Sequence, residues 1–193
     1  MWKLRGVLVW LLLVIALFGP VAAATTSPLL QWRTTIYIAS GFAGILALSL
    51  LFLQPLLARY SLPGLAVKQS KFLHQTIGLL LVMLVLAHVI GLWITSPPDV
   101  IDALLFRSPT QFSVWGVIAM WCTFISAIFA ISRRYLRLGP KFFRRSHQAL
   151  VVLIAVGTVI HALLIEGTME VYTKWLICGL VIFFTAKALI KRP

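Results

Sequence analysis

Long apolar segments separated by short polar connections occupy almost the whole chain. Six of them are about 20 residues long, which is the length of helix that crosses a hydrocarbon core of about 30 Å. They lie at residues 6–23, 34–58, 72–94, 112–132, 146–165 and 171–189. Since a bilayer supplies no partners for exposed backbone groups, spanning segments of this kind are helices. The pattern therefore predicts an all-α integral membrane protein built as a bundle of six transmembrane helices.

The connections between these segments are short, and none has the composition of a linker to a second domain. The Pro-Pro pair at 97–98 is expected to end the third helix, and the Gly-Pro pair at 139–140 to interrupt the chain between the fourth and fifth. The segment VIDALLF at 100–106 is too short to span and is expected at the membrane interface. We therefore interpret residues 1–193 as a single transmembrane domain. No GxGxxG fingerprint follows a predicted strand, which argues against a flavin or nicotinamide domain in this chain.

Residues 1–24 have two interpretations. A basic start, an apolar centre and small residues at Ala22 and Ala24 are also typical of a secretory signal peptide. We favour a retained first helix. In either case the second helix starts on the outer side, so the topology of the remaining chain is unchanged.

The composition excludes a soluble globule, because 61% hydrophobic and 11% charged residues leave too little polar surface to cover one. The net charge of +13 indicates membrane topology and not nucleic-acid binding, because the basic residues are unevenly distributed between the two sides of the membrane. With a cytoplasmic N-terminus, all four acidic residues and only Arg33, Arg107 and Lys174 among the 17 basic residues lie outside. The inner basic residues are Lys3, Arg5, Arg59, Lys68, Lys71, Arg133, Arg134, Arg137, Lys141, Arg144, Arg145, Lys187, Lys191 and Arg192. We predict a multi-pass cell-membrane protein with both termini cytoplasmic, as in a bacterial inner membrane.

All four histidines lie at matching positions in the third and fifth helices. The segments HQTIGLLLVMLVLAH and HQALVVLIAVGTVIH share a His-Gln start and a second histidine 14 positions after the first. Fourteen residues are nearly four helical turns, so His74 and His88 share one face with an offset of about 40°, as do His147 and His161. The members of each helix's pair are about 21 Å apart along the axis. Because both helices run outward, they should present one facing His-His pair near the inner surface and another near the outer one.

Two imidazoles facing each other across an apolar slot are what a six-coordinate haem needs, since each neutral ring supplies one axial nitrogen. Gly78 and Gly157, one turn from predicted ligands, would let a porphyrin approach the backbone. Other interpretations stay open: packing or pH-sensing histidines in a non-redox membrane protein, a proton relay, or zinc binding. The spans contain no Asp or Glu to continue a relay, and two histidines fill only half of a tetrahedral zinc shell.

With these histidine frames in six apolar segments, the chain resembles the ferric reductase-like transmembrane domain. That superfamily includes ferric reductases, NADPH oxidases and the haem-binding membrane subunit of bacterial periplasmic methionine sulfoxide reductase. The resemblance covers essentially the whole chain. It implies haem b between the third and fifth helices, with His74 and His147 binding an inner haem and His88 and His161 an outer one. Two haems are expected, although some relatives bind one.

Two departures from the family restrict the function that the resemblance implies. Complete ferric reductases and NADPH oxidases carry a flavin and nicotinamide domain after the sixth helix, so electrons should come here from a separate flavin reductase with FMN or FAD, or from reduced flavin. NADPH oxidases also have an additional outer histidine, and this chain has no spare one. That difference argues against dedicated superoxide production.

The function we expect is that of a transmembrane cytochrome b, the membrane electron-transfer component of an oxidoreductase. It would pass electrons from a cytoplasmic flavin-linked donor through two bis-histidine haems to an outer acceptor, either a ferric chelate or a periplasmic redox protein. The alternative is an electron-delivery subunit of a periplasmic methionine sulfoxide reductase-type system. The non-redox membrane protein remains the alternative of another class.

Basic residues near the predicted haems are candidates for binding anions. The connection RRYLRLGPKFFRR at 133–145 could receive haem propionates, flavin phosphate or an acidic reductase, or could contact anionic lipid. Lys71 and Arg145 lie close to the inner ligands and are our propionate candidates. On the outer side, Arg107 and Lys174 are candidates for attracting an anionic acceptor.

Overall fold

A computed structural model describes residues 2–59, 62–133 and 135–190, and the regular elements in these ranges are all helical. Six of the described helices are long and apolar enough to cross a membrane, which confirms the predicted all-α, multi-pass architecture. In chain order the elements are α1 Trp2–Ala24, η1 Pro28–Leu30, α2 Thr35–Ala58, α3 Val67–Thr95, α4 Pro97–Leu104, α5 Gln111–Ser132, α6 Pro140–Leu164 and α7 Val171–Ile190.

Two spanning helices begin earlier than their apolar segments predict. Helix α3 begins at Val67 instead of residue 72, and α6 begins at Pro140 instead of residue 146. In each case a polar, basic turn precedes the apolar part, and such a turn can remain helical where water or lipid head groups solvate it. The N–H of Ala66 donates to Gln69 Oε1 at 2.9 Å at the start of α3. Pro140 occupies the first helical position of α6, where a missing N–H costs nothing.

The two prolines after α3 act as predicted. Helix α3 ends at Thr95, and Pro97 and Pro98 form the first turn of the short helix α4. Ser96, between the helices, donates from Oγ to Asp99 Oδ2 at 2.5 Å. With eight residues, α4 is too short to span, in agreement with the prediction for this segment.

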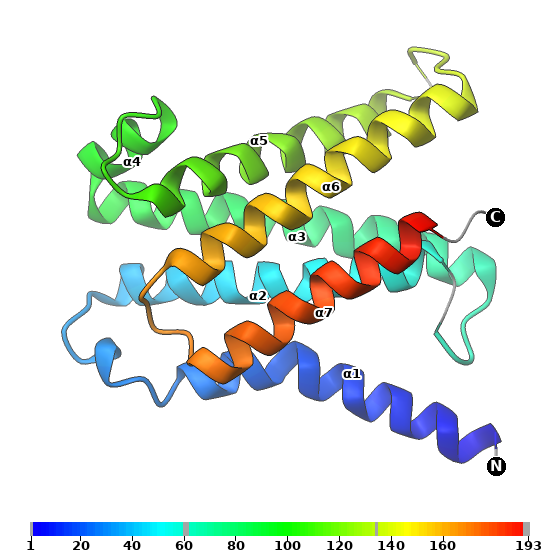
Figure 1. Ribbon diagram of the computed structural model, residues 1–193, viewed down its shortest axis with the longest axis horizontal. Coiled ribbons are helices and arrows are strands. Elements are labelled where there is room, and N and C mark those ends of the chain that lie inside the picture. The colour runs from blue at the N-terminus through cyan, green and yellow to red at the C-terminus, as the bar shows by residue number, and fades with distance from the viewer. Residues whose placement is uncertain (1, 60–61, 134, 191–193) are drawn as a thin grey trace.

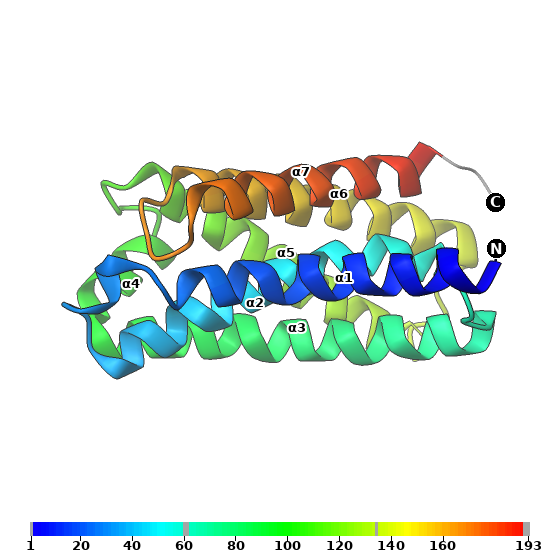
Figure 2. The same cartoon turned by 90° about the horizontal axis from the view of Figure 1, so that it is seen from below.

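The spanning helices form two antiparallel hairpins, α2–α3 and α5–α6, with α7 and α1 added at one side (Figure 1). Packing is close within each hairpin and much looser between α3 and α5 of the two hairpins. Helix α7 packs on α2 and α6, and α1 packs on α2 and α7. The helices run roughly along the long axis of the molecule (Figure 2). The two histidine-bearing helices, α3 and α6, therefore belong to different hairpins and run in the same direction.

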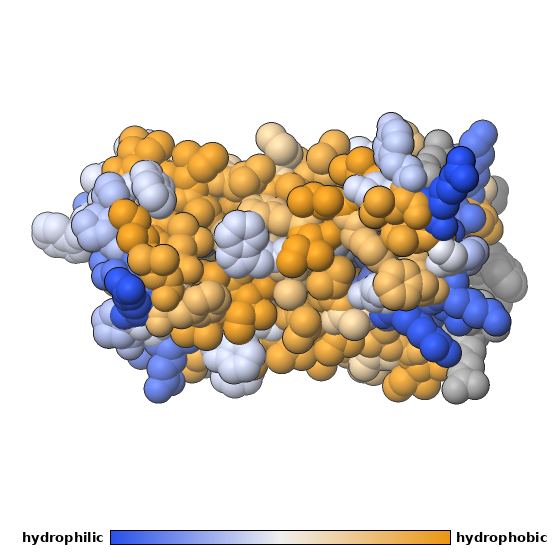
Figure 3. All heavy atoms as spheres, turned by 90° about the horizontal axis from the view of Figure 1, so that it is seen from above, coloured by the Kyte–Doolittle hydropathy of each residue, from blue (hydrophilic) through white to orange (hydrophobic). Residues whose placement is uncertain are grey.

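Charge distinguishes the two ends of the bundle. The end where α1 begins and α7 ends is named here the basic end, and the opposite end the acidic end (Figure 1). Described basic residues at the basic end are Arg5, Arg59, Lys68, Lys71, Arg133, Arg137, Lys141, Arg144, Arg145 and Lys187. The acidic end has Asp99, Asp102, Glu166 and Glu170. Between the two ends lies an apolar belt (Figure 3). Four predicted inner cations lie outside the description: the side chain of Lys3, and residues Arg134, Lys191 and Arg192.

The buried apolar core lies where α2, α6 and α7 meet. Leu57, Ile177 and Val181 are at most 2% exposed. The rings of Phe52 and Phe184 pack edge to face, with centroids 5.6 Å apart. Because this core supports α6 from one side, the opposite side of α6 remains available for the histidines.

Helix α1 packs on the bundle along a narrow stripe. Leu13 and Ala24 are buried, whereas most of the large apolar side chains of α1 are exposed. The indole N–H of Trp10 donates to Pro63 O, in the α2–α3 connection, at 3.1 Å. These contacts are what a retained helix with a lipid-facing side requires. Retention of residues 1–24 stays a prediction.

Candidate functional site

The histidines nearer the acidic end, His88 on α3 and His161 on α6, lie beside each other. Their ring centroids are 6.5 Å apart, with an angle of 79° between the ring planes. They come from different hairpins and are 73 residues apart in the chain. The helix register alone predicts this juxtaposition once α3 and α6 are neighbours.

A backbone carbonyl orients each of these two imidazoles. The Nδ1 atom of His88 is 2.8 Å from Ser40 O on α2, and that of His161 is 2.8 Å from Phe112 O on α5. A carbonyl oxygen only accepts hydrogen bonds, so Nδ1 must bear the proton in both rings. The Nε2 atom of each ring is therefore left with a free lone pair. A ring held in this tautomer by a carbonyl is the usual state of a metal-ligating histidine.

Two glycines allow these imidazoles to lie against the neighbouring helices. A Cβ atom added to Gly116 on α5 would lie 2.6 Å from His161 Nδ1, and one added to Gly44 on α2 would lie 3.0 Å from His88 Nδ1. Both distances are below the usual van der Waals separation. Each glycine comes four residues after the residue whose carbonyl accepts the bond from the same ring, so carbonyl and glycine occupy successive turns of one helix face.

The rings of His88 and His161 are close enough for both to bind one metal ion. Metal–imidazole bonds are about 2 Å long, so two rings that shared an ion would have their centres at most about 6–7 Å apart. The observed value is 6.5 Å. Within the described parts of the chain, no group of three or more His, Cys, Asp or Glu could hold a metal ion. A site of two imidazoles suits haem iron, because the macrocycle supplies four further nitrogens.

The pair nearer the basic end, His74 on α3 and His147 on α6, is built differently. His147 Nδ1 is 3.0 Å from the hydroxyl of Ser126 on α5. The Nδ1 atom of His74 is buried without a hydrogen bond of standard geometry, although the backbone of Gln54 on α2 approaches this ring.

The residues of α2 and α5 that face the four histidines form an internal repeat. On α2, Ser40 and Gln54 are 14 positions apart, and on α5 Phe112 and Ser126 are also 14 positions apart. This equals the spacing between the two histidines on each of α3 and α6. Each hairpin therefore contains one helix with two ligand-type histidines and one helix with their two partners in the same register. The sequence repeat found in the histidine helices extends to the neighbouring helices as a repeat of contacts.

The two glycines selected from the sequence have other neighbours. A Cβ on Gly157 would lie 3.1 Å from Trp115 O and 3.2 Å from Ala119 Cβ, so Gly157 permits close packing of α6 on α5. A Cβ on Gly78 would have the side chain of Gln54 as its nearest neighbour, at 3.8 Å. The glycines in contact with the imidazoles lie instead on α2 and α5. Sequence reasoning missed them because it searched only the helices that contain the histidines.

The basic residues selected from the sequence fall into two groups. Lys71 and Arg145 are exposed at the basic end, three and two residues before His74 and His147, respectively. Arg107 is exposed near the acidic end. Lys174 is only 8% exposed, and its Nζ donates to Ile165 O at the end of α6, at 2.7 Å. A lysine that caps a helix C-terminus is engaged within the fold, so Lys174 is not placed to attract an acceptor from solution.

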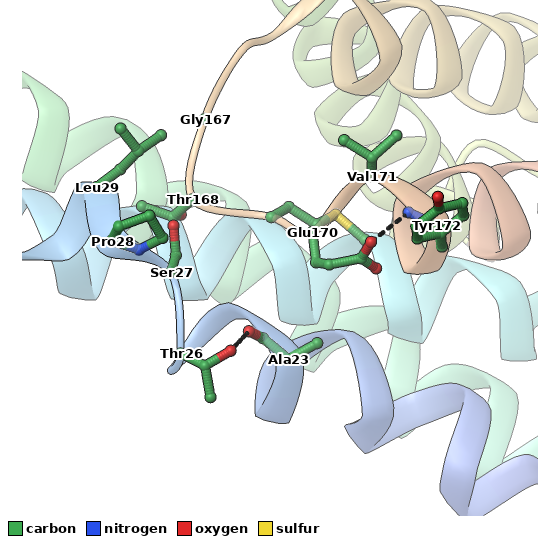
Figure 4. Close-up of a pocket in the computed structure, with 11 residues that line it drawn as sticks. Ala23, Thr26, Ser27, Pro28, Leu29, Gly167, Thr168, Glu170, Val171 and Tyr172 are labelled. Carbon is green, nitrogen blue, oxygen red and sulfur yellow. Dashed lines mark hydrogen bonds between the residues drawn. The ribbon is translucent and has the colours of Figure 1, made fainter.

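A shallow cavity of about 530 Å³ opens at the acidic end. The end of α1, the α1–α2 connection and the α6–α7 connection line it (Figure 4). Its polar groups include the hydroxyls of Thr26 and Thr168 and the carboxylate of Glu170. That carboxylate accepts hydrogen bonds from the N–H groups of Tyr172 and Thr173 at 2.7 Å each, which lowers the pKa of Glu170 below its ordinary value. Both carboxylate oxygens of Glu170 already accept hydrogen bonds at the start of α7, so Glu170 lines this cavity mainly as part of its wall.

Comparison with known proteins gave one family match. The model of the family described as "Ferric reductase like transmembrane component" matches residues 40–158, more than half of the chain. The match begins at Ser40, includes three of the four histidines and ends before His161. Searches of curated proteins and of solved structures gave no match.

Proposed function

Because the chain belongs to the ferric reductase-like transmembrane family, we propose that it is a membrane cytochrome b with two bis-histidine haem sites. The family indicates a membrane electron-transfer component. The observation that supports the haem proposal best is the pair His88 and His161, with centroids 6.5 Å apart and with both Nδ1 atoms bonded to backbone carbonyls. When bound, haem would supply reversible one-electron transfer through its iron.

The protein's contribution is to hold neutral imidazoles in a fixed orientation inside an apolar bundle. At the acidic end, the carbonyls of Ser40 and Phe112 fix the tautomer, and Gly44 and Gly116 make room for the rings. At the basic end, His74 and His147 would be the ligands, and the hydroxyl of Ser126 would orient His147. No acid, base or nucleophile is required, since electron transfer of this kind moves no protein bond.

The direction of electron flow follows in this proposal from the charge of the two ends. Basic connections tend to stay on the cytoplasmic side, so the basic end would face the cytoplasm and the acidic end the outside. A flavin-linked donor carrying FMN or FAD, or reduced flavin itself, would then reach the basic end first. Lys71 and Arg145 lie at that end and would be the candidates for binding haem propionates. The acceptor at the acidic end would be a ferric chelate or a periplasmic redox protein, including a methionine sulfoxide reductase-type partner.

The test is the haem content of the detergent-purified chain, measured by pyridine haemochrome assay with a reduced-minus-oxidised visible spectrum. We expect two b-type haems per chain with low-spin spectra. One haem that disappears in His161→Leu would limit the proposal to the acidic-end site. A colourless protein, expressed with sufficient haem supply and correctly folded, would contradict the proposal and favour packing or pH-sensing histidines.

A further inference from the structure

Three aromatic rings form a stack that ends at a histidine of the basic-end pair. The ring of Phe143 lies on that of His147, with centroids 5.6 Å apart and planes only 10° apart. Phe129, on α5, stacks on Phe143 in turn, at 5.4 Å and 12°. These separations are typical of offset stacking. Since Phe143 comes one turn before His147 on α6, the helix itself keeps the two rings in register.

The stack continues to the surface of the basic end. The guanidinium carbon of Arg133 lies 4.6 Å from the centroid of the Phe143 ring, within the range of a cation–π contact. Arg133 follows the last residue of α5 and is exposed in the basic connection. A continuous set of contacts therefore joins this basic surface to the imidazole of His147.

His161 at the acidic end has no equivalent stack among its described contacts. Phe112 contacts it edge to face, at 5.9 Å and 65°, and a fixed carbonyl orients the ring. The partner of His147 is instead a serine hydroxyl, which can rotate and can either donate or accept. A hydroxyl constrains the ring plane less than a carbonyl does, and the stacked ring of Phe143 adds a second constraint on His147.

We propose that Phe143 is a positioning residue of the basic-end site, whose ring sets the plane of the His147 imidazole and shields it from water. This inference rests on the proposed haem function. The orientation of an axial ligand and the polarity around it are among the means by which a protein adjusts a haem potential. Removing the ring frees the imidazole to rotate and exposes it to the solvated basic connection. The acidic-end haem would be unaffected.

The test compares Phe143→Leu with the matched control Phe142→Leu. Phe142 is 59% exposed and meets Phe129 only edge to face, at 6.2 Å and 68°. We expect Phe143→Leu to change one of the two low-spin electron paramagnetic resonance signals of the oxidised protein. It should also change the reduction equilibrium of one haem by about tenfold, equivalent to about 59 mV for one electron. Phe142→Leu should change neither, and Phe143→Tyr, which retains a stacking ring, should restore both.

The outcomes separate this inference from the function on which it rests. A colourless wild-type protein would contradict the proposed function, and a wild-type protein that lacks only the basic-end haem would overturn this inference, in both cases before any variant is made. If Phe143→Leu contains both haems and its electron paramagnetic resonance signals and reduction potentials equal those of the wild type, the role of Phe143 is overturned. The proposed function then still stands. If Phe143→Leu loses the basic-end haem, retention in Phe143→Tyr and Phe142→Leu supports the inference, and loss in Phe142→Leu as well overturns it as general destabilisation.

Discussion

The two histidine pairs share a register but differ in what holds them. At the acidic end, backbone carbonyls orient His88 and His161, and glycines leave space for their rings. At the basic end, side chains orient His147, through the Ser126 hydroxyl and the stacked ring of Phe143, and His74 Nδ1 has no standard hydrogen bond. Backbone supports cannot change rotamer, whereas side-chain supports can. The acidic-end pair should therefore be the more rigid one, and the basic-end pair the more easily adjusted one.

Removal of one ligand from each pair is the strongest way to break this comparison. His161→Leu should abolish haem binding at the acidic end and leave the basic-end haem, and His147→Leu should do the reverse, since each iron would lose one of its two protein ligands. Each variant should retain about half of the wild-type haem by pyridine haemochrome assay. Unchanged haem content and spectra in either variant would contradict the ligand assignment.

The relative strength of the two sites sharpens this result. A preorganised pair loses less freedom on binding, so the acidic-end site should fill first when protein stripped of haem is titrated. When one haem is supplied per wild-type chain, most of the bound haem should therefore occupy the acidic-end site. The same titration of His161→Leu should lack this first-filled site. Preferential filling of the basic-end site would contradict the difference in rigidity.

Alanine at the two ligand-facing glycines tests the backbone support itself. At Gly116 the new methyl group would lie 2.6 Å from His161 Nδ1, against 3.0 Å at Gly44 and His88. Gly116→Ala should be the more damaging change, because overpacking of this kind typically costs about 1–3 kcal/mol. Haem content and thermal stability would be measured. Gly179→Ala is the control, since nothing lies within 4 Å of its added Cβ, and losses as large as in Gly116→Ala would show a general effect of helix glycines.

Much of this architecture is predictable from the sequence, because apolar length and helical period are local properties. The six spans, the end of the third helix near Pro97 and Pro98, and the position of both histidines of one helix on the same face all follow from them. The early starts of α3 and α6 do not follow from them. Their first turns contain charged residues, so apolar length gives no sign that the helix begins before the apolar segment.

The supports of the histidines are not visible in the sequence for a different reason. The carbonyls of Ser40 and Phe112 belong to residues of unrelated type, so only the three-dimensional register of α2 against α3 and of α5 against α6 identifies them. Similarly, Lys174 looks like a surface cation in the sequence, but its contact with Ile165 O depends on how the α6–α7 connection folds back. Contacts between helices can be identified only when the packing of the helices is known, whereas the relative positions of residues within one helix can be predicted from the sequence.

Ser126→Ala probes the side-chain support of the basic-end pair. Loss of the hydroxyl removes the only standard hydrogen bond described for His147 Nδ1. Supporting groups of this kind typically contribute 10–100-fold to metal affinity, and we expect about tenfold weaker haem binding at the basic end alone. Haem titration of Ser126→Ala would measure it. Thr123→Ala is the matched control, because Thr123 Oγ1 bonds to Ala119 O within its own helix, and equal weakening in both variants would contradict a specific role for Ser126.

The smallest expected effect concerns the two ends of α7. At the acidic end, the Glu170 carboxylate accepts from the N–H groups of Tyr172 and Thr173, and at the basic end the Arg59 guanidinium donates to Ala188 O. The first of these supports depends on a carboxylate, so acid can remove it. These hydrogen bonds hold the pKa of Glu170 below the ordinary 4.5, so their stabilisation is complete above pH 4.5 and is lost as the pH falls through the lowered value.

Between neutral pH and pH 3, the midpoint temperature of thermal unfolding should therefore decrease slightly more for the wild type than for Glu170→Gln, whose side chain has no charge to lose. Above about pH 5 the two profiles should run parallel, because Glu170 is then ionised in both the folded and the unfolded chain and its stabilisation no longer changes with pH. An Arg59→Lys control should keep the wild-type pH profile, because it leaves the Glu170 carboxylate and its two N–H partners at the acidic end unchanged. A Glu170→Gln profile parallel to that of the wild type over the whole pH range would show that acid weakens the bundle elsewhere. In that case the hydrogen bonds of Glu170 at the start of α7 would not be the cause of the loss of stability in acid.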